Sequence, residues 1–408
     1  MTGQRTRTGA DRKLAVLRSN TGEKSPVLCR GHGTKVYDHE DREYLDLFAG
    51  AGRSLLGHGN QPTTDSVSEQ AARLIVSRHE TDTMQKFAGM LADVIPSQFD
   101  RVAFFSTGAE AIDIATRITE EATGVPRQAV LDGAFHGRVG AASLLTDPTH
   151  LAAPSTNKEK IQRLTFPGDG DTSEVDKVAN IAALFYEPLQ ATAGNRLPFR
   201  SHMEQYLRDT RKAGGLIVAD EIFTGFGRTG RMFASEAISD GLEPDIMVIG
   251  KGMANGLPIS ALLLKADVLA QTRFAKPGAL SSTFGGNPLV LAAACATLKT
   301  IQEEGLVRKA VTDGQLWQSL LQKVRGLEVV QDVRVCGEMI GITLLDGVDM
   351  KSVSHALEAR RLLVGTSGQS LRINPPLTIS AEEVAIACER IYEGLYTIQE
   401  ARCGLTTE

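Results

Sequence analysis

Three groups of residues with useful chemistry each follow a short apolar run. The first group, Ser106-Thr107-Gly108-Ala109, comes directly after residues 102–105 and before a helical pattern. Such small residues can seat a phosphate, because free N–H groups at a helix start point at the anion and glycine lets the backbone approach it. An N-cap that only closes a strand–helix turn uses the same residues, so this group alone leaves both interpretations open.

The second and third groups supply an acid and a lysine. Asp220 and Glu221 follow the apolar run 216–219, and ligands of α/β sheets bind beyond the carboxyl ends of strands. A carboxylate there can contact a cationic ring nitrogen; a metal ligand or a solvated strand end are the alternatives. Lys251 stands in a Gly-Lys-Gly sequence after the run 246–249. A desolvated lysine forms imines with aldehydes, whereas a surface lysine in a turn has no such role.

The three groups have one joint explanation. A phosphate seat, an acid and a lysine, each at a strand end and in this order, are the parts needed to hold and use pyridoxal phosphate. A Walker-type nucleotide loop is excluded, because the GxxxxGK[ST] pattern is absent around Lys251.

These residues need a sheet to position them, and the apolar pattern predicts one. From residue 50 onward, short apolar runs alternate with helical stretches such as 109–121 and 203–213. This alternation predicts an α/β fold with a mostly parallel sheet and helices on both faces. The predicted strands are residues 102–105, 129–131, 182–186, 216–219, 246–249 and 261–264.

The same patterns divide the chain into an N-terminal segment and two domains. Residues 1–48 are expected to form a mobile arm followed by short strands that pack with the small domain. A large cofactor-binding domain is expected over 49–288 and a smaller α/β domain over 289–408. The predicted elements of the last domain are one long helix from 288 toward 323, strands at 340–345 and 371–373, and helices at 352–360 and 381–396.

Composition narrows the partners and the compartment. The chain has 408 residues, enough for two or three domains, and its net charge of −5 does not favour nucleic acid or a membrane surface as a partner. Its longest apolar run, near 288–298, is far short of the roughly 20 residues that a bilayer needs. The basic first twenty residues lack the apolar core of a secretory signal. Five scattered cysteines argue against a disulfide framework or a zinc site and fit a reducing cytoplasm.

Further motifs give the sequence a specific resemblance. It resembles the class III aminotransferases, the group of ornithine, 4-aminobutyrate and diamine aminotransferases, from about Pro26 to Ile379. The resemblance implies pyridoxal 5′-phosphate as the cofactor and the fold-type I architecture, a large mostly parallel-sheet domain with a smaller α/β domain. Besides the three groups above, the motifs that carry it are Phe135-His136-Gly137, Glu187-Pro188, Thr224-Gly225-Phe226-Gly227-Arg228-Thr229-Gly230, Thr283-Phe284-Gly285-Gly286-Asn287-Pro288, and Arg372 ahead of Pro375-Pro376-Leu377.

By this resemblance, five residues would surround the cofactor ring. Lys251 would form the imine with the cofactor, and Asp220 would pair with the pyridinium nitrogen. Phe135 would stack on one face of the ring, Ile222 would pack on the other, and Glu187 would brace the pocket near the ring hydroxyl. An opposite charge favours the protonated ring nitrogen, and released Lys251 would move the proton to and from the substrate Cα.

The resemblance also implies how the phosphate is held. Thr107, Gly108 and Ala109 would seat it, and Thr283 would reach the phosphate bound in the partner subunit. Because the phosphate lies far from the reacting atoms, its binding contributes orientation. A homodimer with two equivalent sites is therefore expected.

Three positions depart from the common family pattern and bear on the substrate. Thr192 stands where many relatives that use terminal amines have a second glutamate, which pairs with the arginine equivalent to Arg372. Arg53 stands where relatives usually carry an apolar residue at the substrate mouth, and Phe223 where many carry glutamine. We expect Arg372 to hold a substrate carboxylate directly, because its planar fork suits one. Arg53 would be a second cationic contact or a solvated loop residue, and an amine without a carboxylate stays open as a substrate.

The expected activity is transfer of an amino group from an amine or amino acid to a keto acid or aldehyde. It would run as a ping-pong cycle between the pyridoxal and pyridoxamine forms of the cofactor. An aminomutase, racemase or decarboxylase on the same scaffold is the alternative, and only a transaminase needs a second substrate. A binding module that has lost activity is a third hypothesis, against which the intact Lys251 and Asp220 argue.

Overall fold

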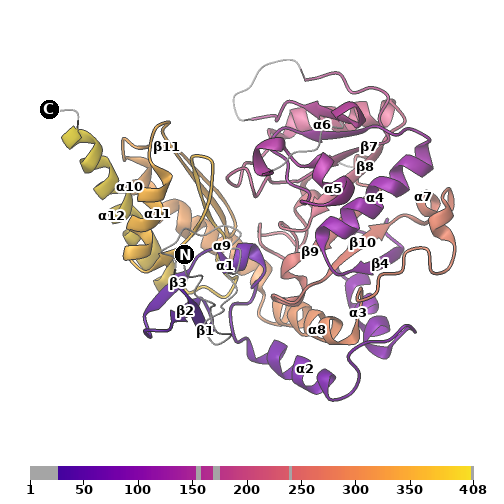
Figure 1. The fold of residues 1–408 in the computed structure, drawn as a ribbon, viewed down its shortest axis with the longest axis horizontal. Coiled ribbons are helices and arrows are strands. Elements are labelled where there is room, and N and C mark those ends of the chain that lie inside the picture. The colour runs from indigo at the N-terminus through magenta and orange to yellow at the C-terminus, as the bar shows by residue number, and fades with distance from the viewer. Residues whose placement is uncertain (1–25, 153–157, 169–174, 239–240, 406–408) are drawn as a thin grey trace, which may run out of the picture.

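The structure is a computed structural model that describes residues 26–152, 158–168, 175–238 and 241–405. The predicted basic arm in the first twenty residues lies outside the described part of the chain. Figure 1 shows a large sheet with its helices on one side of the molecule and the C-terminal helices on the other.

A seven-stranded sheet forms the centre of the larger part. One strand, β10, runs antiparallel to both of its neighbours, and the other pairs are parallel, so the predicted mostly parallel sheet is confirmed. All six predicted strands are present, and the edge strand β6 was missed because its sequence, Ile-Gln-Arg-Leu, is not an apolar run. In sheet order the strands are β4 (Arg101–Phe105), β10 (Ser260–Leu264), β9 (Ile246–Gly250), β8 (Leu216–Glu221), β7 (Ala183–Tyr186), β5 (Gln128–Leu131) and β6 (Ile161–Leu164).

Helices cover both faces of this sheet, as predicted. Successive strand residues point to opposite faces, so Phe185 and Val218 share a core with one set of helices, whereas Leu184 and Ala219 share a core with the other. The first set is α4 (Gly108–Thr123), α5 (Gly140–Leu145) and α7 (Ala266–Ala270). The second set is α2 (Gln61–Ala71), α3 (Asp82–Ala92), α6 (Arg200–Lys212) and α8 (Pro288–Glu303).

The single long helix predicted from Pro288 toward Lys323 is wrong. The structure has α8, then α9 (Leu306–Leu320) and α10 (Gln322–Arg325). The break lies at Gly305, whose φ of 63° is a left-handed conformation that glycine adopts at little cost and that ends a right-handed helix.

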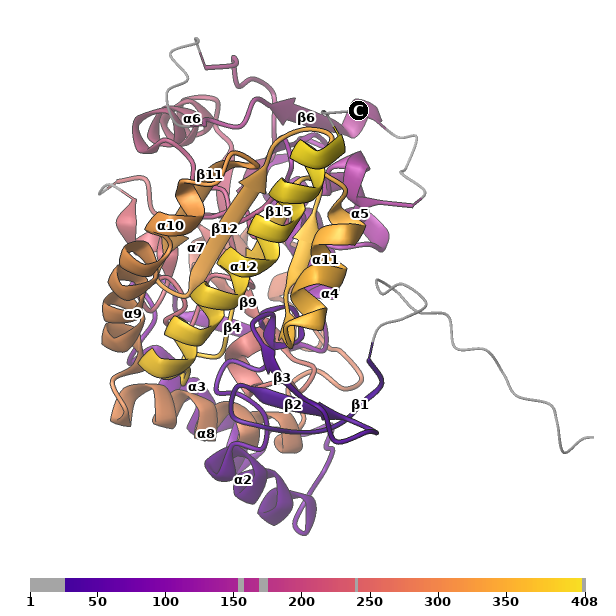
Figure 2. The same ribbon diagram turned by 90° about the vertical axis from the view of Figure 1, so that its left-hand side faces the viewer.

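The C-terminal part is a four-stranded antiparallel sheet covered by helices. Its strand order is β11 (Val330–Cys336), β12 (Met339–Leu344), β15 (Ser370–Ile373) and β14 (Gly365–Ser367). The helices α9, α11 (Met350–Ala359) and α12 (Ala381–Leu405) share its core, and Figure 2 shows α12 crossing in front of β12 and β15. Apart from the long helix, the strands and helices predicted for this part are present, whereas β11 and β14 were not predicted.

The N-terminal strands join the C-terminal part of the chain. β1 (Leu28–His32), β2 (Lys35–Asp38) and β3 (Glu43–Asp46) form a meander, and β3 pairs in parallel with β13 (Leu362–Leu363). Leu45 belongs to the same apolar core as the C-terminal sheet, whereas the apolar residues of α8 belong to the core of the large sheet. The domain boundaries at 48 and 288 stay a prediction.

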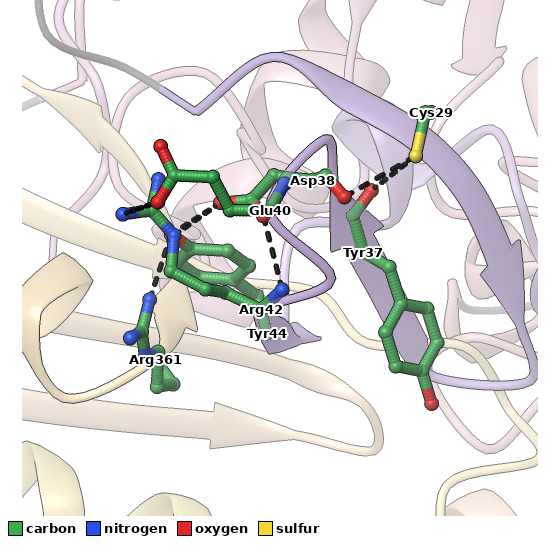
Figure 3. A network of polar contacts seen from close by, with 7 residues as sticks. All are labelled: Cys29, Tyr37, Asp38, Glu40, Arg42, Tyr44 and Arg361. Atoms are coloured by element: carbon green, nitrogen blue, oxygen red, sulfur yellow. Dashed lines mark hydrogen bonds and ion pairs between the residues drawn. The ribbon is translucent and has the colours of Figure 1, made fainter.

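A buried aspartate holds the turn between β2 and β3 (Figure 3). The Asp38 carboxylate accepts hydrogen bonds from the Arg42 side chain at 2.6 Å and from the Tyr44 hydroxyl at 3.1 Å. Burial opposes ionisation, but the bonds from Arg42 and Tyr44 prevail and lower the pKa of Asp38 to about 2. Arg361 donates to the Tyr44 hydroxyl at 2.9 Å, so the turn is linked to the residue that precedes β13.

Short elements complete the described chain. Five 3-10 turns are η2 (Pro148–His150), η3 (Lys158–Lys160), η4 (Ala234–Ala237), η5 (Lys251–Ala254) and η6 (Arg273–Ala275). The helix-like turn α1 (Ala49–Gly52) follows β3. Within the described ranges, no helix combines the length and the apolar character that a membrane span requires.

Candidate active site

Lys251 lies at the end of β9, where the strand passes into η5. Its φ of 45° is unusual for a residue with a side chain and is typical of strained positions at functional sites. The next residue, Gly252, has little room for a side chain, because a Cβ there would lie 3.0 Å from Leu55. Burial lowers the pKa of Lys251 to about 8, against the opposing charges of Asp220 and Glu187. The neutral amine, which is the nucleophile, is therefore more abundant near neutral pH than in an ordinary lysine.

Asp220 lies at the end of the neighbouring strand β8 and is only 4% exposed. Its Oδ2 is 2.7 Å from Nδ1 of His136, and its Oδ1 accepts a hydrogen bond from the Ile222 N–H at 3.0 Å. Both carboxylate oxygens are thus fixed by partners, which sets the orientation of the carboxyl group. The other ring nitrogen of buried His136, Nε2, has no hydrogen-bond partner in the structure.

The adjacent acid, Glu221, has different surroundings. It is fully buried, accepts a hydrogen bond from the Ser235 N–H at 2.6 Å and another from the Thr224 hydroxyl. Burial raises its pKa despite these bonds. Because neighbouring residues of a strand point to opposite faces, Glu221 supports the turn after β8, whereas Asp220 points to the side of His136.

Glu187 follows β7 and approaches the same region. Its Oε1 accepts a hydrogen bond from the Phe135 N–H at 2.9 Å, which ties the segment after β5 to the segment after β7. Burial raises the pKa of Glu187 to about 7; the charge of His136 lowers it and that of Asp220 raises it. This carboxyl group can therefore change its protonation state near neutral pH.

The group around Thr107 forms a capped helix start. The Thr107 side chain accepts a hydrogen bond from the Glu110 N–H at 3.3 Å, and the Glu110 carboxylate accepts one from the Ser106 N–H at 3.0 Å. The side-chain cap by Thr107 bears out the N-cap interpretation, and the first N–H groups of the 16-residue α4 stay compatible with a phosphate seat. A Cβ on Gly108 would lie 2.6 Å from Cδ1 of Ile222, so a larger residue here would require the Ile222 side chain to move.

The remaining predicted cofactor residues differ in exposure. Phe135 is half-buried, and its ring meets the edge of the His150 ring with 6.2 Å between centroids. Ile222 is half-buried and packs against Gly108. Thr283 is exposed, and the next residue, Phe284, is 64% exposed. The structure therefore places Thr283 on the surface of a single chain.

Arg372 is a buried cation on β15. Its side chain is 7% exposed, its Nε has no hydrogen-bond partner, and no ion pair involving it occurs in the part of the chain that the structure describes. Burial lowers its pKa to about 10, against the charge of Glu187. The guanidinium carbon lies 5.2 Å from the centre of the Phe48 ring and 5.6 Å from that of Phe223.

Arg53 directly follows a left-handed turn and is exposed. The φ angles of the four residues from Ala49 to Gly52 are all positive, between 47° and 76°. Arg53 is exposed, and its Nε donates to the Gly50 carbonyl. The structure thus places it on its own loop, without a contact to Arg372, while Thr192 is half-buried.

Comparison with known proteins agrees with this geometry. A family model described as aminotransferase class-III matches residues 19–395. The chain belongs to the class III aminotransferases. It is 33% identical to an acetylornithine aminotransferase of Methanopyrus kandleri, over 92% of this chain and 96% of that protein, and 32% identical to a [LysW]-aminoadipate semialdehyde transaminase of Deinococcus radiodurans, over 94% and 89%. An ornithine aminotransferase structure from Toxoplasma gondii matches with a TM-score of 0.83 and 28% identity, covering 94% of this chain and 93% of that one.

The site fits pyridoxal phosphate, the cofactor of this aminotransferase family. A lysine with a lowered pKa and a buried, oriented carboxylate stand at adjacent strand ends. The start of α4, at Gly108, packs against Ile222, which follows β8 at the same strand end. The described residues contain no group of three or more His, Cys, Asp or Glu that could hold a metal ion.

Two residues of this aminotransferase have contacts that the sequence did not reveal. His136, in the quoted Phe-His-Gly motif, fixes Asp220. Arg228 is fully buried and donates to the carbonyls of Pro375 at 2.8 Å and Gly52 at 3.3 Å. Arg228 therefore connects the turn after β8 with the left-handed turn that precedes Arg53. Both lie in motifs that the resemblance contained, and the motif was the only signal.

Proposed function

We propose that this aminotransferase moves an amino group between an amino acid that carries a carboxylate and a keto acid, with Lys251 and Asp220 as catalytic residues. The observation that carries the proposal is the pair of adjacent strand ends. In the parallel register of β8 and β9, Asp220 lies opposite Val248, and Lys251 follows β9 directly. An acid and a lysine with a lowered pKa are thus presented at one edge of the sheet.

Each residue contributes a defined action. Bound pyridoxal phosphate supplies an aldehyde for amine exchange and a protonated ring that accepts electrons from the substrate. Lys251 would hold the cofactor through its Nζ, and its free amine would accept and return the proton at the substrate Cα. Asp220, oriented by His136, places a negative charge that keeps the ring nitrogen protonated.

Other residues orient the cofactor. The N–H groups at the start of α4, with Thr107, Gly108 and Ala109, would hold the phosphate, which favours the positive end of the helix dipole. Phe135 and Ile222 would flank the ring, and Glu187 braces the segment that carries Phe135.

Four cysteines are free thiols in the described chain, which supports a reducing, cytoplasmic location.

The substrate assignment rests on Arg372. A buried guanidinium without an ion pair is costly, and a substrate carboxylate would satisfy it bidentately. The acetylornithine aminotransferases among the relatives are named for a substrate that carries a carboxylate, which agrees with this assignment. We assign Arg53 to the entrance of the site, on the basis of its exposed position beside the Arg228-bound turn.

The proposal is tested with a panel of amino donors and one keto acid, 2-oxoglutarate. L-glutamate, N-acetyl-L-ornithine, L-ornithine and 4-aminobutyrate are compared with 1,4-diaminobutane, which has no carboxylate. We expect at least one carboxylate-bearing donor to convert the cofactor to its amine form, and turnover to require the keto acid. Turnover without a keto acid would instead indicate an aminomutase, racemase or decarboxylase.

A homodimer is expected, because Thr283 is exposed on the single chain and would act on the partner's cofactor. Exposed apolar residues support this inference: Phe284 is 64% exposed, and the consecutive residues Leu74, Ile75 and Val76 are each 43–53% exposed. Contiguous exposed apolar residues of this kind are typical of contact surfaces. Light scattering after size-exclusion chromatography should give twice the chain mass, and a fully active monomer would contradict the expectation.

The lowered pKa of Lys251 predicts how cofactor capture depends on pH. The neutral amine reacts, so the rate of imine formation with added pyridoxal phosphate should rise with pH and level off above about 8. Stopped-flow absorbance on the apoenzyme measures it, with Nα-acetyl-lysine as the control, whose rate should keep rising toward pH 10 or so. In Glu187→Gln the inflection should shift to lower pH, because Glu187 raises the pKa of Lys251. If the rate for the apoenzyme has the same pH dependence as that for Nα-acetyl-lysine, the assignment of Lys251 as the reacting amine is wrong.

A further inference from the structure

The strands on both sides of Arg372 carry glycine at the paired positions. In the antiparallel register, Arg372 lies opposite Gly341 on β12 and opposite Gly365 on β14. Paired residues project on the same face of a sheet, so any side chain there would flank the guanidinium stem. A Cβ on Gly341 would lie 2.1 Å from the Gly194 carbonyl, and a Cβ on Gly365 would lie 2.3 Å from the Phe48 ring. Other parts of the chain occupy the space beside Arg372.

Two aromatic rings from different elements approach the guanidinium. Phe48 precedes α1 and rests on Gly365, while Phe223 follows β8 and rests on Gly52, where a Cβ would lie 2.7 Å from the ring. The guanidinium carbon of Arg372 is 5.2 Å from the first ring centre and 5.6 Å from the second. Both distances lie within the range of cation–π attraction.

Neutral rings have a specific consequence for the arginine. They stabilise the buried cation through their π-faces and do not accept its N–H groups in the manner of a carboxylate. The Nε of Arg372 accordingly has no hydrogen-bond partner. Thr192, which stands where many relatives have a glutamate, carries no charge. A carboxylate that arrives with a substrate therefore finds the guanidinium edge free and has no ion pair to displace.

We propose that Phe48 and Phe223 are positioning residues that hold Arg372 as a permanent receptor for a substrate carboxylate. This inference rests on the proposed function and deepens it, because it assigns a carboxylate to the substrate class on the structure of the receptor itself. The two rings set the specificity for the substrate: a donor and an acceptor that both carry a carboxylate bind the same unswitched arginine in turn. Phe223 also faces Lys251, whose Nζ lies 4.3 Å from its ring centre, whereas no such contact connects Phe48 and Lys251 in the described residues.

The test measures carboxylate binding directly. Glutarate is titrated into the pyridoxal-phosphate enzyme by calorimetry, with glutaramide as the uncharged probe. Phe223→Leu and Phe48→Leu should each weaken glutarate binding by about three- to thirtyfold, as expected for one cation–π contact, and should leave glutaramide unaffected. Phe48→Leu tests the proposal even if Phe223→Leu fails to fold, and it leaves the surroundings of Lys251 unchanged.

A matched control is available in Phe274. Its ring is 7% exposed, as is that of Phe223, and Arg117 lies over it at 5.3 Å, but it belongs to the core of the far helices α4 and α7. Phe274→Leu should not change glutarate binding. A loss as large as that of Phe223→Leu would mean that general destabilisation explains both, and the proposal would be overturned.

A double-mutant cycle separates positioning from a direct contact. In an Arg372→Lys background, Phe223→Leu should cost little further affinity for glutarate, because the ring acts through the guanidinium. Additive losses would overturn the proposal, as would a wild-type enzyme that does not bind glutarate. An enzyme that binds glutarate as described but does not transaminate any donor of the panel would leave the receptor standing and refute the proposed function. An enzyme that transaminates a donor of the panel but does not bind glutarate as described would refute only the proposed carboxylate receptor.

Discussion

Lys251→Ala should abolish transamination while leaving a folded protein that still binds the cofactor through its phosphate. The loss should amount to several orders of magnitude, because one side chain serves as both the covalent attachment and the proton carrier. The fold should survive, since alanine and lysine meet the same backbone cost at a φ of 45°, and the removed amine is a buried charge. Single-turnover absorbance with L-glutamate measures the loss.

Lys265 offers the matched control for this variant. It also follows a strand of the large sheet directly, but its Nζ pairs with Asp245 at 3.0 Å. Lys265→Ala should keep its activity. Borohydride reduction of the holoenzyme followed by peptide mapping should label Lys251. A label on Lys265 would show that the cofactor is attached there and that the assignment of Lys251 is wrong.

Much of the large sheet could be predicted from the sequence, because its strands are buried on both faces and appear as continuous apolar runs. β9, for example, is Ile-Met-Val-Ile-Gly and is buried throughout. The apolar pattern does not predict a strand that is only partly buried, and it does not predict a helix end that is set by a backbone angle. β6 is an edge strand with polar residues, and the helix break at Gly305 depends on a positive φ that no periodicity indicates.

The positions of the catalytic residues were more predictable than their partners. Asp220 and Lys251 each follow an apolar run, and parallel strands end at the same edge of a sheet, so their proximity follows from the fold. The contact between His136 and Asp220 joins residues 84 positions apart, and only the folded chain reveals it. Arg53 could not be placed from its sequence, because its exposed position follows four consecutive left-handed residues.

Replacing Arg372 with alanine should weaken at least one half reaction by on the order of 2–4 kcal/mol, as for the loss of one side of a hydrogen-bonded charge pair. The protein should remain folded, because the variant removes a buried cation that has no ion-pair partner in the described residues. Arg372→Lys keeps the charge but loses the planar fork, so its effect should be intermediate.

Pre-steady-state kinetics of each half reaction, with L-glutamate and then with 2-oxoglutarate, separates the two carboxylate-binding events of Arg372. Because neither neighbouring ring competes for its N–H groups, we expect the Arg372→Ala loss in both half reactions, mainly in apparent substrate affinity. Arg53→Ala is the control: an exposed residue on its own loop should affect only one of the two. If Arg372→Ala leaves both half reactions unchanged for substrates that the enzyme turns over, Arg372 does not bind the carboxylate. The true substrates would then be amines that carry none.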